Sequence, residues 1–172
     1  MILRCTAKAL DLLGGRRIEL TESPPSGDDW YLNLLWVDGK KCLLLTHAGT
    51  LFSIFVAGVR KADLVPIGPY VVRHIVAELQ REGLPADALG HLDHDAVRLA
   101  KTGSCSTLGF MNEIAADCRY QVDRAGGLAH TDVSGLNHFL RRTLHNHGGY
   151  AYPIDRVAER LDARPQSSAR TR

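Results

Sequence analysis

The 172-residue sequence lacks the features that define several large classes of protein. It has no C-x-x-C pair, no pattern of a signal peptide at its N-terminus, and no apolar run near the roughly 20 residues that span a bilayer. We therefore expect a cytoplasmic protein without a membrane partner. We also expect reduced thiols, because the four cysteines lie far apart: Cys5, Cys42, Cys105 and Cys118.

The common motifs of catalysis and cofactor binding are also missing. The sequence contains neither the Walker A spacing G-x-x-x-x-G-K-[ST] nor the zinc motif H-E-x-x-H, and it has no recognisable RNA-binding or helix-turn-helix pattern. Its 21 lysines and arginines nearly balance 19 acidic residues, so the net charge of +2 neither requires nor excludes a nucleic-acid partner. We expect no cofactor and no metal site.

The composition itself is that of an ordinary globular protein, with 45% hydrophobic and 23% charged residues. A chain of this length can bury a core without disulfides or metals. We predict one domain over residues 1–162 and a flexible basic tail over 163–172.

Residues 30–56 are the most apolar and most regularly patterned part of the chain. Apolar residues alternate on both sides of Asp38-Gly39, a dipeptide that tolerates positive φ, and this predicts a β-hairpin. A third strand is expected over residues 51–56, after a break at Ala48-Gly49. Leu35, Val37 and Leu44 are apolar as well, so both faces of this meander should be covered, one by helices and the other by further protein.

The rest of the chain supplies the covering elements. Strands are expected near residues 1–5 and 96–102, although a short helix after Asp93 fits the second of these nearly as well. We expect helices in five places, bounded by capping residues, proline and glycine: from Thr6 to Leu13, over residues 59–64, from Pro69 to Glu82, from the segment 104–107 to Ala125, and from Thr131 or Asp132 to Leu144. A final helix begins near Pro153, and residues 16–29 are expected to form a mobile surface loop. The predicted fold class is α+β, an antiparallel sheet with three or four helices against one face.

Two places in the chain resemble a bacterial family classed only as a domain of unknown function. The first comprises Leu34-Leu35-Trp36, Lys41-Cys42-Leu43-Leu44, Thr46-His47, Thr50-Leu51-Phe52-Ser53 and Arg60-Lys61-Ala62-Asp63-Leu64; the second comprises Lys101-Thr102, Leu108-Gly109 and Met111-Asn112-Glu113. The resemblance extends from Met1 to about Arg160 and implies no activity. Family members carry arginine at the position of Cys105, in the pattern Lys-Thr-x-x-Arg-Ser, so a donor that the family has is absent from this chain.

The segment from Lys101 to Thr107 is the first candidate site. It lies between a predicted strand and the N-terminus of the longest predicted helix, where free backbone N–H groups and the helix dipole attract anions. Lys101, Thr102, Ser104 and Ser106 would add donors, so the first hypothesis is a binding module for an anionic ligand, a nucleotide or nucleic acid. The alternative is ordinary helix capping beside a solvated lysine.

Two further hypotheses belong to other classes. A hydrolase or nuclease of toxin type would use His47 with Asn112 or Glu113 in one cleft. A protein-interaction domain without a ligand would pair the edge of the meander with a second copy or another protein. For His47 a half-buried packing role is the alternative.

Several remaining residues are interpreted as structural. Two histidine groups, His91 with His94 and His138 with His145 and His147, match no known metal spacing and are expected to be solvated. Cys42 and Cys118 are expected to pack in the core, whereas Cys105 lies near a helix N-terminus. A basic surface for nucleic acid would use Arg60, Lys61, Arg119, Arg124, Arg141 and Arg142, although solvated charge explains them equally well.

Overall fold

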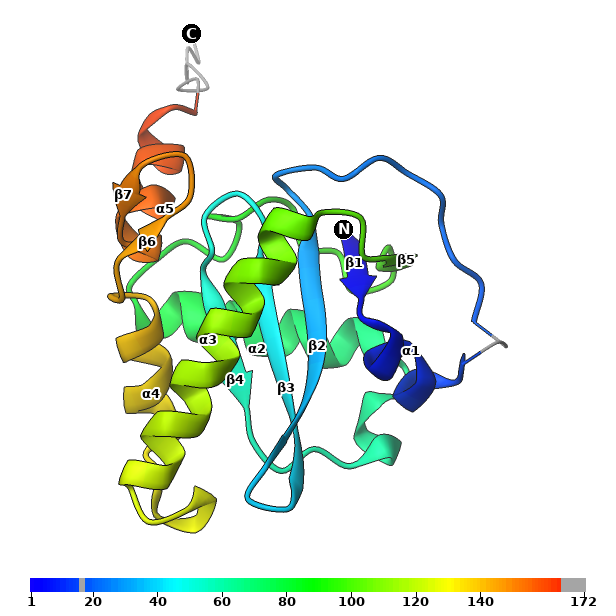
Figure 1. Cartoon of the computed structure of the whole chain (residues 1–172). Coiled ribbons are helices and arrows are strands. Elements are labelled where there is room, and N and C mark those ends of the chain that lie inside the picture. Colours follow the sequence, from blue (N-terminus) through cyan, green and yellow to red (C-terminus); the bar gives the residue numbers. More distant parts are fainter. Residues whose placement is uncertain (16–17, 165–172) are drawn as a thin grey trace, which may run out of the picture.

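The computed structural model describes residues 1–15 and 18–164, and its centre is a sheet of five strands in the order β4-β3-β2-β1-β5 (Figure 1). The strands are β1 (Ile2–Cys5), β2 (Trp30–Val37), β3 (Lys40–His47), β4 (Ser53–Val56) and β5 (Arg98–Lys101). The predicted meander β2-β3-β4 is antiparallel. The expectation of a purely antiparallel sheet is wrong, because β1 runs parallel to both β2 and β5. The α+β class is confirmed.

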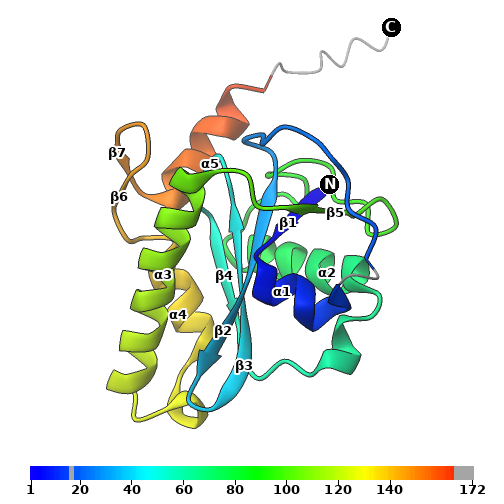
Figure 2. The same ribbon diagram turned by 45° about the vertical axis from the view of Figure 1, so that its right-hand side comes forward.

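Five α-helices surround this sheet in the described part of the chain: α1 (Ala7–Leu13), α2 (Ile67–Arg81), α3 (Cys105–Arg124), α4 (Val133–Leu140) and α5 (Pro153–Asp162). Two 3-10 turns, η2 (Lys61–Leu64) and η3 (Leu128–His130), and a small hairpin of β6 (His145–Asn146) and β7 (Tyr150–Ala151) complete the fold. The hairpin was not predicted. Figures 1 and 2 show α3 crossing one face of the sheet and α2 lying behind the other.

Helices cover both faces of the sheet, which corrects the expectation of helices on one face. Leu32 and Leu43 pack in a core with α1, α2 and α5, whereas Leu35 and Leu44 pack in a second core with α3 and α4. Because successive side chains of a strand point to opposite faces, the continuous apolar pattern of the meander requires this double cover. The sheet is therefore the middle layer of three.

Turn chemistry sets the limits of the meander. Asp38 and Gly39 have φ of 49° and 69°, the conformation that the dipeptide was expected to adopt. Leu51 also has a positive φ of 57°, so it belongs to the turn, and β4 begins at Ser53, two residues later than expected. Thr6 caps α1 by accepting from the backbone N–H of Ala9, as its position indicated.

Both outer strands of the sheet are partly occupied at their open edges. The side-chain amide of Asn137 on α4 pairs with the backbone of β4: its Oδ1 accepts from Phe55 N at 2.7 Å, and its Nδ2 donates to Phe55 O at 3.1 Å. On the other side, Thr21 N donates to Leu99 O of β5 at 2.7 Å. The segment 18–29 contains no helix or strand, and this bond is one of several that fasten it to the sheet.

Two sequence expectations fall partly outside the described residues. Residues 165–172 of the predicted tail and residues 16–17 of the predicted loop lie there. Arg164 is described and forms an ion pair with Asp87 at 3.1 Å. Within the described ranges, no helix is long and apolar enough to cross a membrane.

Candidate functional site

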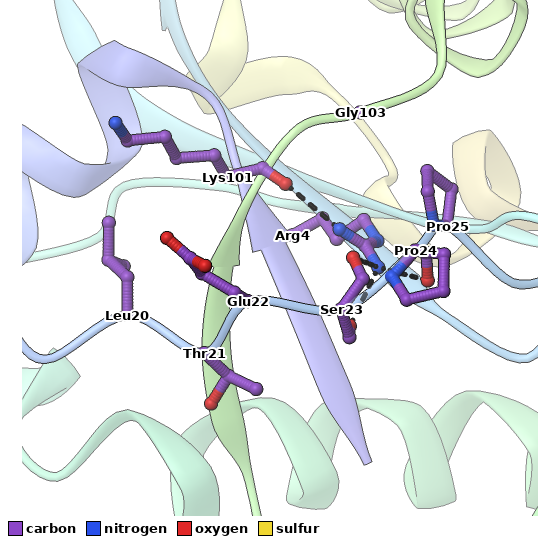
Figure 3. Close-up of a pocket in the computed structure, with 9 residues that line it drawn as sticks. All are labelled: Arg4, Leu20, Thr21, Glu22, Ser23, Pro24, Pro25, Lys101 and Gly103. Atoms are coloured by element: carbon purple, nitrogen blue, oxygen red, sulfur yellow. Dashed lines mark hydrogen bonds between the residues drawn. The ribbon is translucent and has the colours of Figure 1, made fainter.

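A cavity of about 620 Å³ lies beside the end of β5 (Figure 3). It is lined by Arg4, Lys101, Gly103 and the segment from Leu20 to Pro25. Strands β1 and β5 are parallel neighbours, but α1 follows β1 onto one face of the sheet and α3 follows β5 onto the other. Crevices outside the carboxyl ends of parallel strands whose connections diverge in this way are the usual ligand sites of open α/β sheets.

Arg4 forms the inner wall of this cavity and is almost fully buried, with 3% of its surface exposed. Its Nε donates to Asp29 Oδ2 at 2.5 Å, and its Nη1 donates to Lys101 O at 3.1 Å. Its Nη2 donates to the carbonyls of Ser23 and Pro24 at 3.0 and 2.8 Å. Arg4 therefore ties the loop 20–25 to the end of β5, and Asp29 balances its charge.

The local sequence explains why these two segments meet. Pro24 and Pro25 have no backbone N–H to donate and hold an extended backbone, which leaves nearby carbonyls free to accept from Arg4. At Gly103 an added Cβ would lie 2.8 Å from Pro25 Cγ, so a side chain there would force the two segments apart. The cavity wall depends on a proline pair on one side and a glycine on the other.

Two charged groups are free at the cavity. The side chains of Lys101 and Glu22 are exposed, and neither forms an ion pair with another residue that the structure describes. Figure 3 shows both, with Leu20, on the side of the cavity away from the Arg4 guanidinium. A ligand in the cavity could therefore contact one ammonium group, one carboxylate and a short apolar surface.

The structure separates the predicted anion-binding residues. Lys101 lines the cavity, but Thr102, Ser104 and Ser106 are not among its lining residues. Ser104 is the N-cap of α3, and its Oγ accepts from the backbone N–H and the hydroxyl of Thr107 at 3.2 and 3.1 Å. Ser106 is exposed in the first turn of α3. For Ser104 the capping interpretation therefore holds.

The structure does not bring the three residues of the hydrolase hypothesis together. His47 is fully buried and packs edge-to-face on Trp30 at 5.3 Å, on the side of the sheet that α2 covers. Asn112 and Glu113 are exposed on α3, which covers the opposite face. The sheet itself lies between the histidine and the other two side chains.

His47 instead has the properties of a buried neutral group. Its Nδ1 lies 3.0 Å from Thr50 Oγ1, and its buried Nε2 has no hydrogen-bond partner within residues 1–15 and 18–164. Burial, helped by the nearby charge of Arg160, lowers its pKa from 6.5 to about 3.

The pKa of His47 predicts loss of stability in mild acid. Between pH 6.5 and about 3 the unfolded chain binds a proton at this residue and the folded chain does not, so stability must fall as the pH decreases through that range. We expect the wild type to lose about 2 kcal/mol more than His47→Gln between pH 7 and pH 5. Urea titrations of both proteins at the two pH values measure this difference, and equal losses would refute it.

The expectation that both histidine groups are solvated is wrong for His145, which is buried. His138 is exposed beside Glu82 and Arg142, while His145 and His147 pack edge-to-face on Phe110 of α3, and burial lowers the pKa of both. Among the residues that the structure describes, one group of three donor side chains lies within 4.8 Å: Asp93, His94 and Asp95. These side chains already have local partners. The backbone N–H of Asp95 donates to Asp93 Oδ1, and His94 Nδ1 lies 3.0 Å from Asp95 Oδ1.

The cysteines and the basic residues also separate into distinct environments. Cys42 and Cys118 are buried, as expected, and burial raises the pKa of Cys118 to about 12. Cys105 is exposed at the first residue of α3. The inclusion of Arg141 in a basic surface is wrong, because only 1% of its side chain is exposed and it pairs with Glu78 and Glu82.

Arg4 is an important residue that the sequence did not reveal, and Arg141 is one whose role it did not reveal. Arg4 is a lone charge within an apolar strand, and a buried charge requires a partner, so its position alone was a detectable signal. Arg141 follows an amphipathic helix and resembled a surface residue. Its partners are 59 and 63 residues away in the chain, which no local pattern reveals.

The sequence matches a known protein family. A family model described as a domain of unknown function (DUF6933) covers residues 2–156, nearly the whole chain. No curated protein matches the sequence. The matched region includes all five strands of the central sheet, Arg4 and the cavity beside Lys101.

Proposed function

The chain belongs to the family described as a domain of unknown function (DUF6933), and we propose that it binds a phosphate-bearing ligand, a nucleotide or nucleic acid, in the cavity beside Lys101. The observation that carries this proposal is the position of the cavity at the carboxyl ends of β1 and β5, where the following helices diverge to opposite faces. Its volume of about 620 Å³ is in the range of small-molecule sites.

The charges at the cavity are compatible with such a ligand. Lys101 is exposed and has no ion-pair partner among the described residues, so it can pair with a phosphate, whereas Arg4 is already bound to Asp29 and to backbone carbonyls. The N-terminus of the 20-residue helix α3 follows two residues after Gly103 and contributes positive potential. Glu22 would accept from a sugar hydroxyl or a base amino group, which favours a nucleotide over inorganic phosphate.

The test is binding to the intact protein. Isothermal titration with mononucleotides, inorganic phosphate, and short RNA and DNA strands should find a ligand. Lys101→Ala should weaken its affinity about ten- to a hundredfold, the usual value of a charge-assisted hydrogen bond. Lys40→Ala is the matched control, because Lys40 is also an exposed strand-end lysine but lies at the β2-β3 turn. No binding of any of these ligands, or equal binding by the two variants, would overturn the proposal.

A further inference from the structure

A second surface, at the hairpin end of the sheet, carries an exposed tryptophan. The chain has two tryptophans: Trp30 is fully buried, whereas 57% of the surface of Trp36 is exposed. Both point to the face covered by α1 and α2, but α1 ends at Leu13 and leaves Trp36 and part of Leu34 uncovered. Lys41 is the cross-strand partner of Trp36, and its Nζ lies 5.6 Å from the centre of the indole ring.

Trp36 belongs to a shallow hollow of about 410 Å³. Its apolar floor is formed by Leu12, Leu34 and Trp36, and its charged residues are Lys8, Lys41, Lys61 and Asp11. The lysines come from α1, β3 and η2, and none of them forms an ion pair with another described residue. Three ammonium groups without ion-pair partners among the described residues thus surround one exposed aromatic ring, opposed by a single carboxylate, and that of Lys41 lies over the ring itself.

This combination selects among possible partners. Protein interfaces are enriched in tryptophan but depleted in lysine, so a protein partner accounts for the ring and not for its surroundings. Single-stranded nucleic acid accounts for both, because its bases stack on exposed aromatic rings and its phosphates attract lysines. A duplex keeps its bases stacked on one another and would leave the ring unused.

We infer that Trp36 is a stacking site for one base of a single-stranded nucleic acid, with Lys8, Lys41 and Lys61 bound to the adjacent phosphates. The site is separate from the cavity beside Lys101, because the two share no lining residue. The inference therefore does not depend on the proposed function.

Fluorescence provides a direct test, because Trp36 is the exposed one of the two tryptophans. A short oligothymidylate should quench the intrinsic emission of the wild type. Trp36→Ala should weaken the affinity, measured by anisotropy of the labelled oligonucleotide, about ten- to a hundredfold, as expected for one stacked base. Trp36→Phe should keep most of the affinity while losing the quenching. Each variant should keep the wild-type melting temperature, since the side chain is exposed.

Tyr120→Ala is the matched control. Tyr120 is similarly exposed, at 59%, and has Arg124 5.7 Å from its ring centre, but it lies on α3. Its replacement should leave the affinity unchanged. Single-strand binding should also weaken with salt, and Lys61→Ala should make the slope of log K against log salt concentration shallower by about 0.7.

Three results would overturn the inference: no quenching, equal affinity of Trp36→Ala and wild type, or tighter binding of an acidic peptide than of the oligonucleotide. The second result could come with loss of binding in Lys101→Ala, which would assign the oligonucleotide to the cavity. That last pattern would leave the proposed function of the cavity intact, so the two failures are distinguishable.

Discussion

Arg141→Ala is expected to lower the free energy of unfolding by about 3–5 kcal/mol, the usual effect of removing one partner from a buried ion pair. Arg141 Nη1 lies 3.0 Å from Glu78 Oε2 and its Nη2 lies 2.7 Å from Glu82 Oε1, with 4% of each glutamate side chain exposed. The guanidinium also lies 4.9 Å from the centre of the Phe52 ring. Its loss would leave two buried carboxylates poorly compensated, and urea unfolding would measure the cost.

Arg142→Ala is the natural comparison. Arg142 binds the other oxygen of Glu82 at 2.7 Å, but 40% of its side chain is exposed, so its loss should have a much smaller effect. Burial would raise the pKa of Glu82, but Arg142 and Arg141 outweigh it and hold the pKa at about 2. The ion pairs of Glu82 with these two arginines therefore contribute stability above pH 4.5 that disappears as the pH falls toward 2. Arg141→Ala should reduce that acid dependence. Equal destabilisation by the two variants would contradict this interpretation of the network.

Arg4→Ala should be similarly severe, at about 3–5 kcal/mol, because Asp29 would remain as an unpaired buried carboxylate. It should also release the loop 20–25, because the carbonyls of Ser23 and Pro24 accept hydrogen bonds from the guanidinium. Hydrogen exchange at Thr21, whose N–H donates to β5, should then accelerate more than exchange in the centre of the sheet. Urea unfolding and exchange of the same sample measure both effects.

Arg4→Lys and Arg60→Ala complete that experiment. Lysine keeps the charge but cannot bind Asp29, Lys101 and the loop carbonyls at once, so it should recover only part of the stability. Arg60 also forms a close ion pair, with Asp63, yet it is fully solvated, and its removal should leave unfolding unchanged. If Arg4→Ala behaved like Arg60→Ala, Arg4 would have no structural role and the cavity wall would need another explanation.

Local chemistry made much of the fold predictable. The Asp38-Gly39 turn, the Thr6 cap and the glycine after α2 each follow from the few conformations that their residues prefer. The strand near residues 96–102 was recognised too, as β5. Its direction was not, because alternation shows that a segment is extended but not which neighbour it pairs with. The parallel pairing of β1 with β5 joins residues about 96 positions apart.

The candidate site was predictable to a smaller extent. Lys101 was identified from its place between a strand and a helix, and the structure places it at the cavity. The segment 20–25 forms the other wall, and in the sequence it resembled a loop without a role. The two walls are joined by Arg4, an arginine within strand β1. The exposure of Trp36 was hidden for a similar reason. The alternation that suggested a strand does not show where the covering helix ends.

The contact between Asn137 and β4 forms late during synthesis on the ribosome. The amide of Asn137 pairs with the backbone of β4 across 82 residues of chain, so β4 is synthesised long before the residue that occupies its edge. At 5–20 residues per second the gap is about 4–16 s. During that interval the edge of β4 is open to pairing with neighbouring chains, and it is covered only when α4 has been synthesised. Growth conditions that slow translation between residues 55 and 137 would lengthen the exposure.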